Sequence, residues 1–176
     1  MPEPTKFSHS ITLDHFILKN KSEASRKWDK VACAIYDLFS KWLQSYAAGT
    51  NSALETKKAI RKFLGPQIEP SYIYSDNSKE IEKAIAELNW DDRHDTSIPN
   101  YPNTNGEIER CVRTVKEGIN TSLVQSGLSP VWWADAMRFF DLMHNVTFKC
   151  ADGETPYEKR FKNKFTGPIW PLGCEI

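Results

Sequence analysis

The sequence predicts an α/β protein in which helices cover a central mixed sheet. Along the 176 residues, short apolar and β-branched segments alternate with longer segments whose apolar residues repeat at helical spacing. Hydrophobic residues make up 40% of the chain and charged residues 26%, which is ordinary for a globular domain with its own core. The segment order is strands, helix, strand, helix, short strand and then helices, and it favours a sandwich around one sheet.

The first part of the chain contains the segments that we expect to form most of the sheet. Residues 11–18 are apolar and β-branched between polar neighbours, which is typical of a strand. Residues 30–46 begin with a nearly unbroken apolar run, as in a strand buried on both faces, and continue into a second strand that pairs with it. Residues 52–65 form a predicted helix, because Ser52 and Glu55 fit a capping box.

The middle of the chain alternates between the two kinds of segment. Residues 71–77 form a predicted short strand that ends in Asp-Asn, and residues 79–90 form a helix with a buried apolar stripe. Residues 95–100 fit one more short strand. Residues 101–106, YPNTNG, all favour turns, so we predict a loop there.

Two long helices and an irregular segment complete the predicted fold. The first helix extends from about residue 107 to about residue 125 and contains Gly118. The second starts at Ser129-Pro130, with proline at the first helical position, and ends near residue 148. The proline-rich remainder is predicted to be packed but irregular.

The composition argues against several classes of protein. The net charge is 0, from 23 basic and 23 acidic residues, which argues against a protein that coats nucleic acid by bulk charge but allows a local basic strip. The four cysteines form no C-x-x-C pair and lie at no metal-site spacing from histidine, so we expect reduced thiols in an intracellular protein and no zinc site. No segment approaches the roughly 20 apolar residues of a membrane span, and we expect no secretory signal.

Three acidic residues stand out by their positions. Asp14 lies within a predicted apolar strand, on the same face as Thr12 and Phe16, where an unpaired carboxylate is costly to bury. Asp76 lies at the C-terminal end of its strand, where open α/β sheets present groups to ligands. Glu109 lies on the first turn of a predicted helix. Together they suggest a carboxylate cluster for a hard cation such as Mg²⁺.

Each of these residues also has a purely structural interpretation. Asp76 is equally compatible with capping the helix that follows it. Glu109, taken alone, fits a residue that favours a helix N-terminus and pairs with Arg113. The structural interpretation is weakest for Asp14, because acidic residues are depleted in strands. His15 points to the opposite face of that strand by alternation, so we expect it to have a packing role.

Several segments resemble the catalytic core of retroviral-type integrases, the D,D-E group of the ribonuclease H-like superfamily. ITLDHF, IYSDN and YPNTNGEIER occur in the order in which that family carries its two aspartates and its glutamate. YDLFSKW resembles the family's second-strand signature and TKKAIRKFLG its first helix. WWADAMRFFDLMHN, GETPYEKRF and FTGPIWPLGC resemble segments that follow the core in polyproteins of long-terminal-repeat retrotransposons. The resemblance covers residues 10–174.

The resemblance implies a fold, a division of the chain and a set of partners. The expected fold is ribonuclease H-like, with a central mixed sheet of about five strands flanked by helices. Residues 1–9 would be a flexible N-terminal extension, residues 10–150 the catalytic core, and residues 151–176 an irregular, truncated tail of that core. The expected partners are the retroelement DNA ends, the target DNA and a second copy in a homodimer. The expected location is the nucleus, and no membrane or small-molecule substrate is expected.

The resemblance also implies that Asp14, Asp76 and Glu109 are both catalytic and metal-binding. Two Mg²⁺ or Mn²⁺ ions held by such carboxylates stabilise the attacking and leaving oxygens of an in-line phosphoryl displacement. With water as nucleophile the reaction trims a DNA 3′ end. With that 3′-hydroxyl as nucleophile, the same site joins the end to a target strand, so the expected enzyme is a polynucleotidyl transferase and endonuclease.

The resemblance implies that basic residues near Glu109 and the loop before it contact DNA. Arg113 and Lys116 lie on the same predicted helix face as Glu109, where the resemblance places them against the DNA backbone. Their structural alternative is a solvated face of salt bridges.

The resemblance also implies that Asn105 and Gly106 form the hinge of a loop that closes on DNA, and that Tyr101 and Asn103 are DNA contacts. Two residues depart from the common family pattern. Ser78 stands where most members have glycine, and Asn103 replaces a frequent glutamine.

Two other functions stay open at the level of the sequence. A domesticated, non-catalytic integrase-like module would use the fold only for DNA binding or dimerisation, although a complete set of three acids weighs against it. A ribonuclease H or another D,D-E transposase would keep the fold and the metals and change the substrate. The zinc module and the basic end domain of full-length integrases are missing, so we expect weak or nonspecific strand chemistry from this chain alone.

Overall fold

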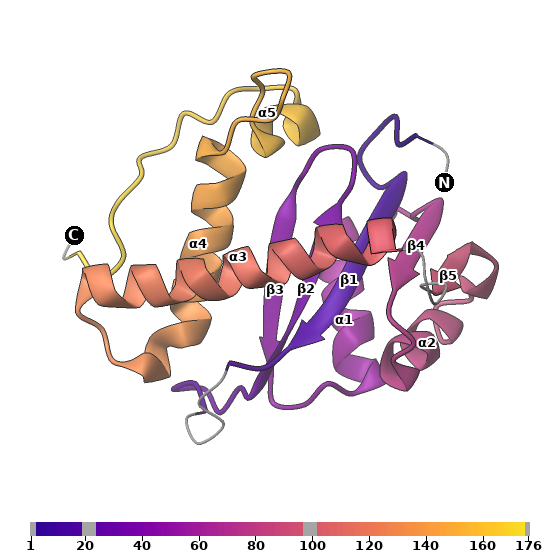
Figure 1. Cartoon of the computed structure of the whole chain (residues 1–176), viewed down its shortest axis with the longest axis horizontal. Coiled ribbons are helices and arrows are strands. Elements are labelled where there is room, and N and C mark those ends of the chain that lie inside the picture. Colours follow the sequence, from indigo (N-terminus) through magenta and orange to yellow (C-terminus); the bar gives the residue numbers. More distant parts are fainter. Residues whose placement is uncertain (1–2, 19–23, 97–101, 175–176) are drawn as a thin grey trace.

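A five-stranded mixed sheet forms the centre of the fold (Figure 1). The computed structural model describes residues 3–18, 24–96 and 102–174, and for residues 102–105 only the course of the helix. The strands are β1 (Ser10–Phe16), β2 (Val31–Asp37), β3 (Leu43–Ala48), β4 (Tyr72–Ser75) and β5 (His94–Thr96), in the order β3-β2-β1-β4-β5. β2 is antiparallel to β1 and β3, whereas β4 is parallel to β1 and β5.

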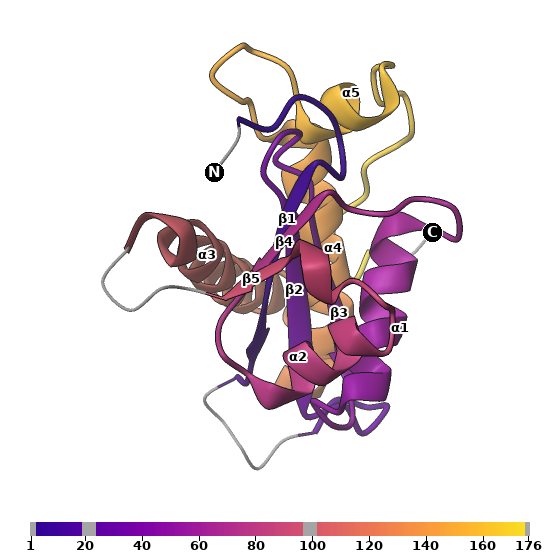
Figure 2. The same cartoon turned by 90° about the vertical axis from the view of Figure 1, so that its right-hand side faces the viewer.

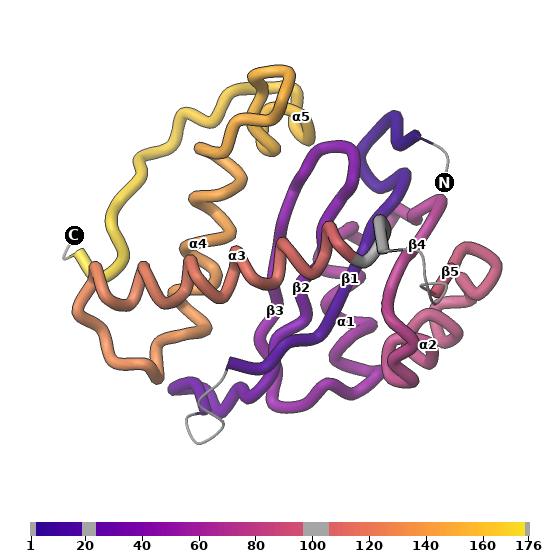
Figure 3. Tube along the Cα trace, viewed as in Figure 1, coloured from indigo at the N-terminus to yellow at the C-terminus, as the bar shows by residue number. Residues whose placement is uncertain are grey.

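Helices cover both faces of this sheet, as the side view in Figure 2 shows. The helices are α1 (Ala53–Leu64), α2 (Lys79–Ala86), α3 (Pro102–Ser126), α4 (Trp133–Thr147) and α5 (Pro156–Phe161), with single 3-10 turns at Asp91–Arg93 and Pro130–Trp132. α1 and α2 pack on one face and α3 on the other. The helix α3 crosses β1 and β2 (Figure 3). In the described ranges, no helix is long and apolar enough to cross a membrane.

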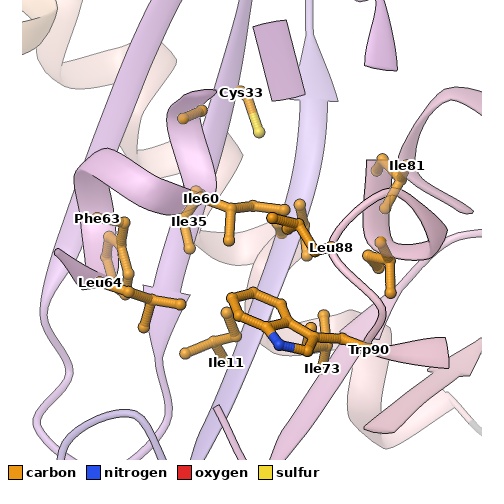
Figure 4. Close-up of a cluster of buried hydrophobic side chains, with 13 residues drawn as sticks. Ile11, Cys33, Ile35, Ile60, Phe63, Leu64, Ile73, Ile81, Leu88 and Trp90 are labelled. Carbon is orange, nitrogen blue, oxygen red and sulfur yellow. The ribbon is translucent and has the colours of Figure 1, made fainter. Parts of the chain in front are cut away.

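Strand alternation separates two hydrophobic cores. Ile11 and Leu13 of β1 join the cluster under α1 and α2, which also contains Phe63 and Trp90 (Figure 4). Phe16 points to the opposite face, into the cluster under α3 and α4. The face that carries Thr12, Asp14 and Phe16 is therefore the α3 face, as the sequence predicts. Every residue of β2 is buried, which confirms the prediction of a strand covered on both sides.

The edge strand β3 is covered by side chains of α4. The backbone N–H of Leu43 donates to Asn145 Oδ1 (2.9 Å), and Asn145 Nδ2 donates to the carbonyl oxygen of Leu43 (2.7 Å). The backbone N–H of Ser45 donates to Asp141 Oδ2 (2.6 Å), and burial raises the pKa of Asp141 to about 8. These bonds satisfy backbone groups that an open sheet edge would leave unpaired, and they fix α4 on the sheet.

The predicted loop over residues 101–106 is wrong for residues 102–106, which are helical. Pro102 is the first residue of α3, a position where its fixed φ and missing N–H suit the helix start. Asn105 and Gly106 therefore lie in a helix and not at the hinge of a loop. Tyr101 and residues 97–100 of the predicted short strand lie outside the described residues.

The helix α5 lies in a segment for which the sequence analysis predicts no helix. Thr155 and Glu158 form a capping box at its start, and both hydrogen bonds of the box are present. The guanidinium of Arg160 lies 4.1 Å from the ring centre of Phe7, and its Nη2 donates to the carbonyl oxygen of Phe63 (3.0 Å). α5 therefore ties the segment after α4 and the start of the chain to the α1 side of the core.

The contact between α3 and α4 depends on Gly118, because a Cβ on this residue would overlap the ring of Phe140. We expect Gly118→Ala to lower the free energy of unfolding by about 1–3 kcal/mol, the usual effect of overpacking. Gly106→Ala is the matched control, since a Cβ there meets open space and alanine favours a helix. Urea unfolding of both variants checks this, and an unchanged midpoint for Gly118→Ala would show that α4 does not need this close approach.

Candidate active site

The two predicted aspartates lie at the same end of two neighbouring strands. β1 and β4 are parallel, and Leu13 lies opposite Ser75. Asp14 and Asp76 are the next residues of the two strands in this register, and neighbouring strands are about 4.8 Å apart. Asp14 is half-buried and Asp76, which directly follows β4, is exposed. The parallel pairing therefore brings together two carboxylates that are far apart in the sequence.

The surroundings of Asp14 disfavour its negative charge. Burial raises the pKa of its carboxyl group to about 6, and the negative charge of Asp76 adds to this rise. Glu109 raises the pKa further, and Lys116 acts in the opposite direction. Asp14, Asp76, Glu109 and Lys116 therefore share one electrostatic environment at the C-terminal end of β1.

Glu109 faces this environment from α3. Ile108, Val112 and Val115 point into the core, and polar residues of the same helix line a cavity of about 610 Å³. Asp14, Glu109, Arg113 and Lys116 all line this cavity. Lys116 is half-buried, and its Nζ lies 5.5 Å from the ring centre of Phe16, two residues beyond Asp14 on the same strand face.

The purely structural interpretation holds in part for Asp76 and not for the proposed ion pair of Glu109. Asp76 Oδ1 accepts a hydrogen bond from the backbone N–H of Ser78 (3.2 Å), so this carboxylate also supports the turn into α2. Glu109 makes no ion pair with Arg113 or with another cation in the described part of the chain. The ion pair at this end of α3 belongs instead to Glu107, whose Oε2 lies 3.2 Å from Nζ of Lys41.

The prediction for His15 is confirmed. Its Nε2 lies 3.0 Å from Oγ1 of Thr56 on α1, so the ring lies on the face of β1 opposite Asp14. Burial lowers the pKa of His15, which favours the neutral ring. The side chain is part of the packing between β1 and α1.

The side-chain oxygens of the site are the kind of ligand atoms that a hard divalent cation prefers. The three side chains offer carboxylate oxygens, which Mg²⁺ and Mn²⁺ prefer. A cation would offset both the burial and the neighbouring carboxylates that raise the pKa of Asp14. Among the residues that are described, no three acidic, histidine or cysteine side chains are close enough to share one ion. Asp14 and Asp76 are thus adjacent in register, while Glu109 lines the same cavity as Asp14 without closing on the two aspartates.

Two of the remaining predicted DNA contacts line the cavity, and the structure does not describe the side chains of the other three. Arg113 is exposed and lines the cavity, as does Lys116. Nothing is described of the side chains of Asn103 and Asn105 or of Tyr101.

The cavity also extends to residues that were not predicted as part of a site. They continue it away from the carboxylates, along α3 and toward the connection to α4: Leu18, Glu117, Ile119, Asn120, Leu123, Pro130 and Trp133. A signal for part of this wall was present in the sequence. Asn120 and Leu123 continue the spacing of four and three residues that connects Glu109, Arg113 and Lys116 on one helix face.

We expect Asp14→Asn to stabilise the metal-free protein at neutral pH. The pKa of Asp14 is raised from 3.8 to about 6 in the folded chain, so the folded state binds the proton more tightly and stability falls as the pH rises through this range. The variant should gain about 1–2 kcal/mol at pH 7.5, allowing for screening by solvent, and almost nothing at pH 3.5.

Urea unfolding in EDTA at the two pH values measures this difference. Asp92→Asn is the control, since it removes one negative charge from an exposed position outside the site. An Asp14→Asn variant that is less stable than the parent at pH 7.5 would show that the carboxylate stabilises the fold and is not held at a cost.

Comparison with known proteins places this geometry in a known fold. No protein-family model and no curated protein matches the sequence. Among solved structures, the chain is similar to the catalytic core domain of BIV integrase in crystal form I, with a TM-score of 0.62 and 20% sequence identity. The match covers 88% of this chain and 95% of that chain. The predicted fold class is thereby confirmed: a mixed five-stranded sheet flanked by helices, with the ribonuclease H-like fold of an integrase catalytic core.

Proposed function

We propose that this chain is the catalytic core of an integrase of the long-terminal-repeat retrotransposon type. In this proposal it cuts DNA near a 3′ end and joins that end to a target strand, with Asp14, Asp76 and Glu109 as its catalytic residues. The observation that carries the proposal is the alignment of Asp14 with Asp76 at the same end of two parallel strands, together with the cavity that Asp14 and Glu109 both line.

The three carboxylates would hold Mg²⁺ or Mn²⁺. Bound there, two such ions supply charge stabilisation for the attacking and leaving oxygens of a phosphoryl displacement. Half-burial of Asp14 keeps part of its hydration shell away, which strengthens every electrostatic interaction at that carboxylate. Asp14 and Asp76 repel one another, so binding of a positive charge at this site is favoured.

The basic residues of α3 would position the DNA backbone. Arg113 is exposed beside Glu109, and its planar guanidinium suits bidentate contact with a phosphate. Lys116 is half-buried with its Nζ 5.5 Å from the ring centre of Phe16, and its charge offsets part of the carboxylate repulsion at Asp14. Asn103, Asn105 and Tyr101 are proposed as further DNA contacts on the strength of the sequence resemblance alone.

The remaining parts of the proposal follow the same resemblance. Residues 10–150 would form the catalytic core, between an N-terminal extension and a C-terminal tail. The core would act as a homodimer on retroelement ends and target DNA in the nucleus.

A strand-cleavage assay tests the proposed function. The chain is incubated with Mn²⁺ and a labelled branched DNA, and an RNA–DNA hybrid is run in parallel. We expect cleavage and joining of the branched DNA that EDTA abolishes and that Asp14→Asn, Asp76→Asn and Glu109→Gln each reduce by about 1000-fold or more. Asp95→Asn is the matched control, since it removes an exposed carboxylate from the neighbouring strand β5 and should leave the rate unchanged.

The outcomes separate the proposal from its rivals. Binding of DNA without cleavage by the unmodified chain would favour the non-catalytic module. Preferential cleavage of the hybrid would favour a ribonuclease H. Activity that survives in Asp14→Asn and Asp76→Asn would contradict the assignment of the site itself.

A further inference from the structure

The cavity beside the candidate active site is much larger than a site for one phosphate requires. Its volume is about 610 Å³, within the range of about 300–1,000 Å³ that is usual for pockets that enclose organic ligands. Its wall on α3 extends from Glu109 to Leu123, which corresponds to about 21 Å at the rise of an α-helix. The cavity therefore continues well beyond the carboxylates.

The two ends of this cavity differ in chemistry. The end near β1 carries the charges of Asp14, Glu109, Arg113 and Lys116. The far end is mainly apolar, and its wall consists of Leu18, Ile119, Leu123, Pro130 and Trp133. Leu18 and Leu123 are half-buried, whereas Trp133 is 5% exposed and is held in the core beneath them. We name this far end the distal pocket.

Polar groups of α3 line the cavity next to the distal pocket. Asn120 and Glu117 are exposed and line the same cavity. An amide offers both donors and an acceptor, and a carboxylate offers acceptors. An occupant with an apolar flat body and hydrogen-bonding edges fits this arrangement, with an anionic group directed toward Arg113 and Lys116.

We propose that the distal pocket binds one unstacked base of the DNA strand on which the site acts, with Arg113 and Lys116 on the adjoining phosphate. This proposal rests on the proposed function and names a substrate subsite for it. A nucleotide combines the features that the cavity demands, because its base has apolar faces and polar edges and its phosphate is an anion. The position of the two cations between the carboxylates and the distal pocket supplies the charge complementarity.

The binding of short oligomers tests the proposal without any cutting. A fluorescein-labelled (dT)₆ is compared with an abasic deoxyribose-phosphate hexamer of the same length, in EDTA and at low salt. Both carry the same phosphates, so their difference in Kd isolates the bases. We expect (dT)₆ to bind about 5- to 50-fold more tightly, as base stacking on protein side chains typically provides.

Variants of α3 locate the effect. Leu123→Trp and Asn120→Trp both place a large ring in the cavity and should reduce the preference for (dT)₆ to less than twofold. Asn120 is exposed, so its variant tests the pocket even if Leu123→Trp perturbs the core. Val124→Trp is the matched control, because Val124 is 82% exposed and does not line the cavity, and it should keep the full preference.

Three results would overturn the proposal. The first is equal binding of the two hexamers, or no binding of either. The second is a base preference that survives in both cavity variants. The third is a change in sedimentation of the DNA-free chain in these variants, which would assign the distal pocket to a second copy of the protein.

The binding and cleavage experiments test the distal pocket and the proposed function independently. A base preference in the unmodified chain without Mn²⁺-dependent cleavage would keep the distal pocket and remove the integrase chemistry. Cleavage with equal binding of the two hexamers would do the reverse.

Discussion

The parallel pairing of β1 with β4 is the constraint on which the site depends. It sets Asp14 and Asp76 level at one end of the sheet, and Asp14 cannot leave this position without breaking the register of a central strand. Burial and the neighbouring carboxylate both raise the pKa of Asp14, so the fold holds a charge where it is disfavoured. Functional sites typically contain groups whose charge is disfavoured but which the surrounding structure holds in place.

The rest of the fold keeps this arrangement rigid on three sides. α1 fills the opposite face of β1, where Ile60 is part of the core and His15 contacts Thr56. α3 crosses the site face, and Gly118 lets α4 pack close behind it. Asp141 and Asn145 attach α4 to the edge strand β3. The helix that carries Glu109 is therefore fixed through α4 to the far edge of the same sheet.

Local sequence patterns predict most of this framework because they report burial directly. Alternation in β1 assigns Asp14 to the α3 face and His15 to the α1 face, and both assignments match the structure. The approach of Asp76 to Asp14 depends on strand order, which no local pattern specifies. The positions of the acids suggest a carboxylate cluster, and the family resemblance is what implies that these particular residues meet.

The errors occur where local preference and tertiary context disagree. YPNTNG favours turns residue by residue, yet Pro102 can begin a helix, and the long apolar stripe of α3 that follows stabilises that helix. Thr155 and Glu158 fit a capping box in the sequence, but the helix they start is too short for its periodicity to be recognised. The cavity lies between β1, α3 and the start of α4, so only the part of its distal wall that belongs to α3 has a signal in the sequence.

Diffraction from crystals soaked in Mn²⁺ tests most directly whether the three acids act as one metal site. The account predicts an anomalous peak within ligand distance of both Asp14 and Asp76, with the side chain of Glu109 moved toward it. An absence of density there at millimolar Mn²⁺, or an ion bound by Asp76 alone with Asp14 and Glu109 unmoved, would contradict the account.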